Sequence, residues 1–378
     1  ETSWAIDAGP GSEAVTNEPA PNGGRLNLGA YGGTVQASRS DTNNPALYAA
    51  SFRDGGTSVD GQLMYWLYRG LNPTNTVRIE YSPDNGATWL LAAPNADGLA
   101  IDSAPFAWYN NLADPSPLAL WRIVLVADTN VWNGIPTNFV FRPRFLKYYV
   151  NDASDEGDVY TKGLGSPLNN GYLSNSPLHS IHAVMERYPI APGDEIRVDT
   201  GTYPLSNTVF VSVLLNGTPA NPVTFRGSTN WAKGGTTLMP TGGMRDAAFT
   251  VYGARNVNLA NFRTVGFSNG LKIVEFAAQC TAADLDVQGS ESPGVEITQA
   301  SQIRLERVLI REGKANALLA DLSQQLVLEG CVLWSNRNSA LSFGQGVSVE
   351  ITNSVIEASG QGRYCYESST NPTIRADY

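Results

Sequence analysis

Two aspartates and two arginines in the second half of the chain could together perform acid–base chemistry. Asp284 and Asp286 are two residues apart, and Arg307 and Arg311 follow further along. Residues two apart on a β-strand point to the same face, so the two carboxylates are expected to be neighbours. Paired carboxylates can serve as general acid and general base. The alternative is a surface ion pair between Asp284 and Arg307, worth about 0–1 kcal/mol, and we favour that interpretation.

An acidic loop is the second group of side chains with chemical potential. Asp152, Asp155 and Asp158 offer the hard carboxylate oxygens that calcium binds in proteins. Their spacing differs from that of an EF-hand, so the loop is a candidate calcium site, with a solvated polar loop as the alternative. No other cofactor is expected.

Histidines and aromatic residues give weaker evidence for a catalytic or binding site. The chain has two histidines, His179 and His182, too few for a typical zinc site. Both lie on the helix predicted below, and we expect His182 to be packed or exposed rather than catalytic. Aromatic residues could stack on sugar rings if they were exposed in a row. The candidates for such a row are Tyr160, Tyr172, Trp231 and Trp334.

The elements that position these side chains follow from a period of 23 residues. Short runs of alternating apolar residues begin at Val257, Cys280, Ile303, Leu326 and Val349, which are 23 apart. A fixed period of this length indicates stacked units, none of which can bury its own apolar face alone. The same period places Asp284 and Arg307 at equivalent positions of neighbouring units.

The alternation within each unit predicts strands rather than helices. Polar or small residues mark the turns, and a leucine-rich consensus is absent. The sequence therefore predicts a parallel β-helix whose strands stack in register, with the Val, Ile and Leu positions forming inward columns. The predicted turn residues are Gly266, Ser268–Gly270, Gly289, Ser290, Glu312, Gly313, Ser335, Asn336 and Gly360–Gly362.

A short amphipathic helix is predicted just before this region, over about residues 177–188. Ser176 and Pro177 resemble a helix start. Leu178, Ile181, Val184 and Met185 would share one face of the helix. Such a helix can cover the open end of a β-helix, where backbone groups would otherwise be unpaired.

The stretch YYVNDASDEGDVY, the helix and PGDEIRVDTGTY resemble the opening of the pectin-lyase-like right-handed parallel β-helix superfamily. The resemblance covers about residues 147–378 and implies a right-handed fold. Lyases of the superfamily need acidic residues that hold calcium and a basic residue, usually arginine. Its hydrolases need clustered aspartates. The superfamily also includes adhesins and structural modules, so the resemblance leaves the activity open.

The first 41 residues resemble a different part of the same kind of fold. NGGRLNLGAYGGT, residues 22–34, is similar to the closing coil of a β-helix in large bacterial extracellular repeat proteins. Its glycines suit tight turns, and Leu26, Leu28 and Tyr31 can face inward. With Asn22 and Gly24, these residues are the candidate assembly site. The alternative is a plain glycine-rich loop.

The order of these parts is inverted, because a closing coil comes first and an opening comes last. The chain also stops in mid-pattern at residues 371–378, and it has no signal peptide. Solenoids normally carry terminal caps. Two explanations fit: the chain is a segment of a longer protein, or residues 1–40 complete the open end of a neighbouring copy. The second is a head-to-tail contact that can build filaments.

Residues 42–145 predict a separate β-sandwich of immunoglobulin or fibronectin type III kind. Strand-like runs alternate with turn clusters. The expected core and rim aromatics are Trp66, Trp89, Trp108 and Trp121. SPDNGATW, residues 82–89, matches an Asp-box pattern, and a hairpin turn at Asp84–Gly86 is the simpler interpretation.

Composition limits the partners. The net charge of −10 and pI near 4.8 argue against nucleic acid and anionic membrane surfaces, and no apolar run is long enough for a membrane span. Of the three cysteines, Cys280, Cys331 and Cys365, the first two occupy apolar columns and should be buried. Low charge and few cysteines suit a secreted or cell-surface β protein.

These observations favour an extracellular structural repeat unit of a long surface protein or head-to-tail filament. The residues themselves indicate no convincing catalytic cluster, so we lean against an enzyme. Two alternatives stay open: a fragment of a secreted polysaccharide lyase or hydrolase, and a carbohydrate-binding adhesin.

Overall fold

The computed structural model places two compact units, residues 1–144 and 145–378. It describes residues 3–10, 12–41, 44–58, 62–109, 115–142, 145–244, 246–357, 366–368 and 373–377, with side chains to residue 357 and for 373–375. Nearly all regular structure is β, in agreement with the predicted fold class. The described residues contain one α-helix, α1 (Ile181–Arg187), and two short 3-10 helices, Val213–Leu215 and Trp231–Lys233.

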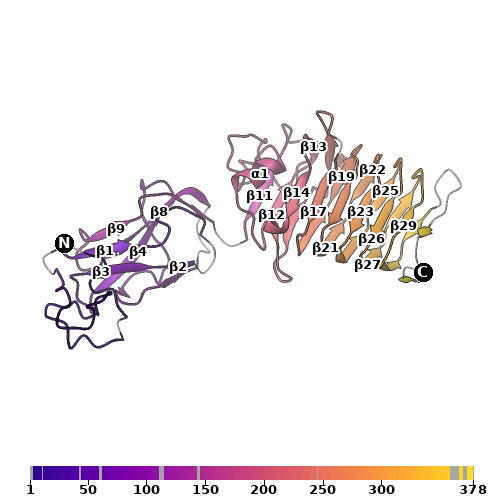
Figure 1. Cartoon of the computed structure of the whole chain (residues 1–378). Helices are drawn as coiled ribbons and strands as arrows, with labels where there is room; N and C mark the ends of the chain where they lie inside the picture. Colours follow the sequence, from indigo (N-terminus) through magenta and orange to yellow (C-terminus); the bar gives the residue numbers. More distant parts are fainter. Residues whose placement is uncertain are drawn as a thin grey trace. The chain divides into compact units, whose positions relative to one another are not determined.

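The second unit is a parallel β-helix of three sheets, visible as a row of stacked strands (Figure 1). Sheet A contains β11 (Lys147–Val150), β12 (Glu195–Val198), β15 (Val223–Arg226), β18 (Val257–Ala260), β21 (Ala278–Ala283), β24 (Ser301–Glu306), β27 (Gln324–Glu329), β30 (Ser348–Thr352) and β33 (Thr373–Asp377). Sheet B contains β13 (Gly201–Leu205), β16 (Thr236–Pro240), β19 (Phe262–Val265), β22 (Asp286–Gln288), β25 (Leu309–Arg311), β28 (Val332–Trp334) and β31 (Val355–Ile356). Sheet C contains β14 (Val209–Ser212), β17 (Phe249–Tyr252), β20 (Leu271–Val274), β23 (Val295–Thr298), β26 (Leu318–Asp321), β29 (Leu341–Phe343) and β32 (Tyr366–Ser368). From β12 onward, the described chain adds strands to sheets A, B and C in turn, whereas α1 lies between β11 and β12 of sheet A.

The register of sheet A confirms the 23-residue period. Cys280 pairs with Ile303, Ile303 with Leu326, and Leu326 with Val349. These side chains are buried in one continuous apolar core. Stacking like residues over like residues buries each coil against its neighbours, which no single coil could do alone.

Left-handed backbone at the corners keeps the period constant. One residue turns the chain from sheet A to sheet B, and its φ is positive in five successive coils: Asn261 at 62°, Asp284 at 52°, Arg307 at 52°, Gly330 at 63° and Asn353 at 49°. Non-glycine residues pay a steric cost there, which asparagine bears better than most. The predicted turn residues Gly266, Gly289, Glu312 and Ser335 form the equivalent corner after sheet B; the turn prediction at 360–362 lies outside the described residues.

The cap helix exists but begins later than predicted. Ser180 caps α1, because its hydroxyl accepts a hydrogen bond from the Ala183 N–H at 3.1 Å. Leu178 is instead extended and bridges to Val150. Ile181 and Val184 are buried in the β-helix core and Met185 packs partly against it, as expected of a cap.

The first unit is built from antiparallel strands around an aromatic core. Its six-stranded sheet has the order β10-β8-β4-β5, with β6 also on β4 and β9 also on β8, and β1 pairs with β3 and β2 with β7. The strands are β1 (Ala46–Ala49), β2 (Gln62–Met64), β3 (Trp66–Arg69), β4 (Thr76–Ser82), β5 (Leu90–Leu91), β6 (Leu99–Ala100), β7 (Phe106–Trp108), β8 (Ser116–Leu125), β9 (Trp132–Gly134) and β10 (Phe139–Phe141). The assignment to the immunoglobulin or fibronectin type stays a prediction.

The aromatic residues of this unit lie where the sequence predicted. Trp66, Trp108 and Trp121 are buried in its core and Trp89 is half-buried at the rim. The Asp-box-like stretch joins the antiparallel strands β4 and β5. The Asp84 carboxylate accepts hydrogen bonds from the N–H and hydroxyl of Thr88, at 2.8 and 2.7 Å, and these bonds lower its pKa. This stretch is therefore a hairpin connection.

Residues 3–41 contain turns and no strand among those described, and they belong to the first unit. Trp4 packs against Tyr48, and the Arg25 guanidinium lies 5.3 Å from the centre of the Tyr68 ring. Leu28 and Tyr31 do not face inward within this chain, because Leu28 is 55% exposed and Tyr31 is 61% exposed. Their segment turns back at Gly29 and Gly33, where φ is positive, and presents them to solvent.

Cys280 and Cys331 are buried, as predicted, and both are free thiols. Burial raises the pKa of the Cys280 thiol to about 11 and also raises that of Cys331. Such thiols behave as small apolar residues. Cys365 lies outside the described residues. No helix in the described part of the chain is long and apolar enough to cross a membrane.

Candidate functional site

Asp284 and Arg307 are stacked neighbours, as their spacing predicted. Both sit at the left-handed corner between sheets A and B. Arg307 donates from Nε and Nη2 to the two Asp284 oxygens, at 2.7 and 2.8 Å. These hydrogen bonds raise the pKa of the Arg307 guanidinium. The pair is largely exposed, so it contributes about 0–1 kcal/mol.

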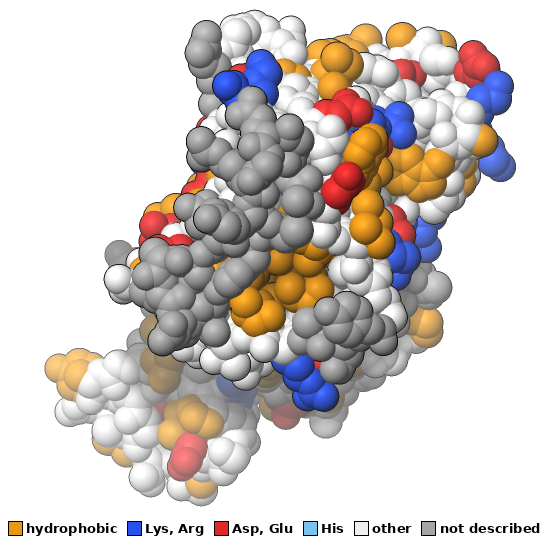
Figure 2. Space-filling model, turned by 90° about the vertical axis from the view of Figure 1, so that its right-hand side faces the viewer, with side chains coloured by type: hydrophobic (Ala, Val, Ile, Leu, Met, Phe, Trp, Pro, Cys, Tyr) orange, Lys and Arg blue, Asp and Glu red, His pale blue; other side chains and the backbone are white. Residues whose placement is uncertain are grey.

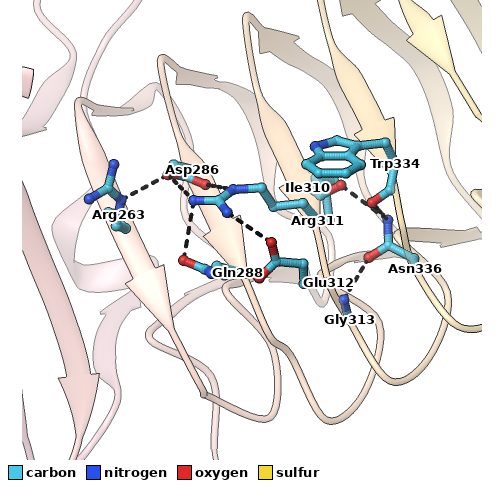
Figure 3. A network of polar contacts seen from close by, with 9 residues as sticks. All are labelled: Arg263, Asp286, Gln288, Ile310, Arg311, Glu312, Gly313, Trp334 and Asn336. Carbon is cyan, nitrogen blue, oxygen red and sulfur yellow. Dashed lines mark hydrogen bonds and ion pairs between the residues drawn. The ribbon is translucent and has the colours of Figure 1, made fainter.

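Asp286 lies on β22, at the centre of a larger polar network (Figure 3). Its side chain is only 10% exposed and accepts from Arg263 at 2.8 Å and from Arg311 at 3.0 and 3.1 Å. Arg311 also donates to Gln288 at 3.2 Å and to Glu312 at 3.1 Å. The hydrogen bond with Asp286 raises the pKa of the Arg311 guanidinium. The network joins three successive coils across the outer face of sheet B.

The structure corrects how the two aspartates share a surface. The two aspartates do not share one face of a single strand, because Asp284 occupies the positive-φ corner and only Asp286 is in β22. Both line a shallow depression of about 230 Å³, beside Trp231 and Leu309. Each carboxylate has both oxygens bound to guanidinium groups. An arrangement of this kind fastens neighbouring coils together.

Two of the three aspartates of the acidic loop, Asp152 and Asp158, have separate side-chain contacts. Asp152 accepts from the Ser154 N–H at 2.7 Å, and Asp155 is exposed. Asp158 accepts from Asn151 at 2.7 Å and from the Thr161 hydroxyl at 3.0 Å. Burial, and then the charge of Asp199, raise the pKa of Asp158. Among the residues that the structure describes, no three His, Cys, Asp or Glu side chains are placed to hold a metal ion.

Asp199, a residue that no sequence pattern singled out, organises this loop. It is fully buried, and its carboxylate accepts from the N–H groups of Val159, Tyr160 and Thr161 at 2.6, 2.7 and 2.7 Å. The Thr161 hydroxyl and the Thr200 N–H add contacts at 2.9 and 2.8 Å. Buried backbone donors require such partners. The loop therefore serves to close the first coils.

The histidines and the proposed aromatic row have other roles. His179 is exposed, and the ring of His182 contacts the Thr208 carbonyl at 3.0 Å. Two of the four aromatics lie beneath arginines: Arg197 is 5.3 Å from the Tyr160 ring and Arg263 is 5.6 Å from the Trp231 ring. Tyr172 packs edge-on against Tyr188. Trp334 lies on sheet B, so the four do not form a row.

A different aromatic pair lies on the outer face of sheet C. Phe210 of β14 and Tyr252 of β17 are 45% and 43% exposed, with ring centres 5.6 Å apart. They line a depression of about 340 Å³ together with Thr250, Lys272 and Glu296 of the neighbouring strands. The Lys272 ammonium lies 3.7 Å from a Glu296 oxygen. Aromatic faces next to fixed polar groups are typical of a binding surface.

The surface around this pair is hollowed in two further places. At the corner from sheet C to sheet A, Gln299 also lines a depression of about 420 Å³ with Arg255, the 70% exposed Phe276, Leu322 and the first residues of β21, β24 and β27. Further along sheet C, a depression of about 370 Å³ is lined by residues of β26 and β29 and by Gln345. We call the three depressions together the sheet C groove.

The alternation of β14 and β17 contained the signal for this groove. In VFVS and FTVY the inward positions are Val209, Val211, Phe249 and Val251, all buried. Phe210 and Tyr252 occupy the outward positions, where a large aromatic gains nothing from the core. An aromatic at an outward position of an alternating strand was the available clue.

Comparisons with known proteins agree with the architecture. A family model described as the right-handed β-helix region matches residues 247–377. No curated protein matches the sequence. Among solved structures, pectate lyase Pel9A is similar with 16% identity and a TM-score of 0.42, covering 57% of this chain and 54% of its own. A rhamnogalacturonan lyase has 16% identity and a TM-score of 0.37, covering 62% of each chain.

The Agl-KA catalytic domain is also similar, with 12% identity and a TM-score of 0.40, covering 88% of this chain and 72% of its own. This chain thus spans less than two thirds of the first two structures. These likenesses concern the fold alone. The matched family model and the three parallel sheets show that the second unit contains a right-handed parallel β-helix.

Proposed function

We propose that this chain is an extracellular polysaccharide-binding protein that holds its ligand along the sheet C groove. The exposed pair Phe210 and Tyr252 carries the proposal. Sugar rings present C–H groups with partial positive charge, which complement the negative face of an aromatic ring. The hydroxyl, carboxylate and ammonium groups beside the pair can satisfy sugar hydroxyls.

Binding is favoured over catalysis by the state of the candidate acids. Asp284 and Asp286 are both held by arginines on sheets A and B, away from the sheet C groove. The residues that the sequence singled out for acid–base chemistry would therefore not face a ligand held in the groove. The alternative of a lyase or hydrolase fragment predicts new unsaturated ends or reducing ends on incubation with polysaccharides, which our proposal does not.

The first prediction tests the aromatic pair. Phe210→Ala and Tyr252→Ala should each weaken polysaccharide binding about tenfold, the factor expected for about 1.4 kcal/mol of lost stacking. Affinity electrophoresis or titration calorimetry against a panel of soluble polysaccharides would measure the loss. Trp334→Ala is the matched control, because Trp334 is an aromatic of similar exposure, 38%, on the outer face of sheet B. Equal loss in the control, or none in the pair, would contradict the proposal.

A second candidate function is head-to-tail association through residues 22–34. Leu28 and Tyr31 are exposed and therefore available to a neighbouring copy. Hydrophobic side chains also gather on the face of the β-helix beside its last coils (Figure 2). Contact between two unlike surfaces of this kind would build a chain of copies.

The second prediction tests that association by sedimentation velocity at several concentrations. A Leu28→Ser/Tyr31→Ser variant should associate about 30-fold more weakly, because a central tyrosine contributes about 2 kcal/mol to an interface. Leu214→Ser is the control, since Leu214 is 86% exposed in the other unit. A wild-type chain that stays monomeric at high concentration would exclude this function without affecting polysaccharide binding.

A further inference from the structure

The sheet C groove carries an excess of negative charge. The described residues around Phe210 and Tyr252 include three carboxylates, Asp246, Glu275 and Glu296, and one ammonium, Lys272. Lys272 is already paired with Glu296. In the described part of the chain, no ion pair joins Asp246 or Glu275 to a cation. Among the described residues, two acidic groups therefore line the groove without an ion-pair partner.

The other two depressions do not neutralise this excess of negative charge. Arg255 lines one and Asp321 lines the other, so their charges cancel. The Asp321 carboxylate also accepts from the Gln345 N–H at 2.7 Å, which fixes it beside the groove. Over the whole sheet C groove the described lining has four carboxylates and two cations.

Charge of this sign selects among polysaccharides. A polyuronate brings one carboxylate on each sugar, and its charges would lie within a Debye length, about 8–10 Å, of the groove carboxylates. Like charges at that distance repel. A neutral sugar instead donates its hydroxyl protons to the carboxylates, which accept hydrogen bonds only. Charge-assisted hydrogen bonds of this type are the stronger ones.

We propose that the ligand of the sheet C groove is a neutral, hydroxyl-rich polysaccharide, and that Asp246 and Glu275 exclude polyuronates. This inference rests on the polysaccharide-binding function proposed above. Phe210 and Tyr252 supply affinity for any sugar ring, and the two carboxylates supply the discrimination. Because the discrimination is electrostatic, it should weaken as salt rises.

The experiment compares neutral polysaccharides, a soluble β-glucan and a galactomannan, with polygalacturonate. The full chain is titrated with each at about 20 mM and about 300 mM sodium chloride, with EDTA and separately with calcium. We expect at least one neutral polymer to bind about tenfold more tightly than polygalacturonate at low salt, with a smaller difference at high salt. The Asp246→Asn/Glu275→Gln variant should lose most of this preference by gaining affinity for polygalacturonate.

The matched control is Asp155→Asn/Glu186→Gln, which removes the same charge at two exposed positions outside the groove. It should keep the preference. Tighter binding of polygalacturonate by the wild-type chain, with or without calcium, would overturn the inference while leaving polysaccharide binding intact. Neutral polymer that binds equally well to Phe210→Ala and Tyr252→Ala would instead show that the groove is not the binding site. If no polymer binds, both proposals fail.

Discussion

Replacing Asp199 with alanine is expected to destabilise the second unit by about 4 kcal/mol. The buried carboxylate accepts five hydrogen bonds, four of them from residues 159–161. A buried donor left without a partner costs about 1–3 kcal/mol. Several of these donors lie near the surface and can recruit water, so the total should fall below the sum. Chemical denaturation of the full chain, followed by circular dichroism, would measure the loss.

Two variants make this result specific. Asp199→Asn keeps one acceptor oxygen and should lose about half as much stability. Asp155→Ala removes an exposed carboxylate from the same loop and should change stability by less than about 0.5 kcal/mol. If Asp199→Ala and Asp155→Ala unfolded at the same denaturant concentration, the organising role of Asp199 would be wrong.

Replacing Asp286 with alanine should have the next largest effect, about 2 kcal/mol. Asp286 is nearly buried between Arg263 and Arg311, and its loss leaves two guanidinium groups close together without their anion. Removing one partner of a buried pair costs about 3–5 kcal/mol, but both arginines are partly exposed here, which reduces the penalty. The measurement is again denaturant unfolding of the full chain.

Asp284→Ala provides the comparison within the same surface. Its partner Arg307 is exposed, so the loss should stay below about 1 kcal/mol. A larger loss from Asp284 than from Asp286 would contradict our ranking. Neither substitution should alter polysaccharide binding, because neither side chain lines the sheet C groove.

The columns of the β-helix were predictable because the core imposes the same requirement on every coil. Ile303, Leu326 and Val349 occupy one inward position and are all buried. The stacking of Asp284 on Arg307 followed from the same period. What the period could not reveal was the backbone conformation at that corner. Asp284 resembles a strand residue in the sequence, yet its φ is 52°.

Hydrogen bonds to other parts of the chain explain two further differences between the sequence-based expectation and the structure. Ser176 and Pro177 satisfy the usual pattern for a helix start, but the Leu178 N–H and carbonyl bond to residues 149 and 151, which delays the helix until Ser180. Asp199 lies in a stretch that resembles a simple turn, and its partners are about 40 residues away in the chain. Long-range hydrogen bonds of this kind leave no local pattern in the sequence.

The candidate site was harder to predict than the fold because its residues are not a motif. Phe210, Tyr252 and Glu275 come from three separate coils or corners and meet only when the strands stack. Sequence alternation could identify Phe210 and Tyr252 as outward aromatics. It could not identify Asp246 and Glu275, since an acidic residue in a turn is ordinarily solvated.

The positive-φ corner that recurs every 23 residues also makes the coil a natural unit of length. Because Asn261, Asp284, Arg307, Gly330 and Asn353 turn the chain in the same way, one coil can be removed or duplicated between two corners without shifting any inward column. Each such event would change the length of the solenoid by one strand spacing, about 4.8 Å. The length of polymer that the groove contacts can therefore change by one coil at a time. The outward residues of each coil then determine which groups of the polymer that coil binds.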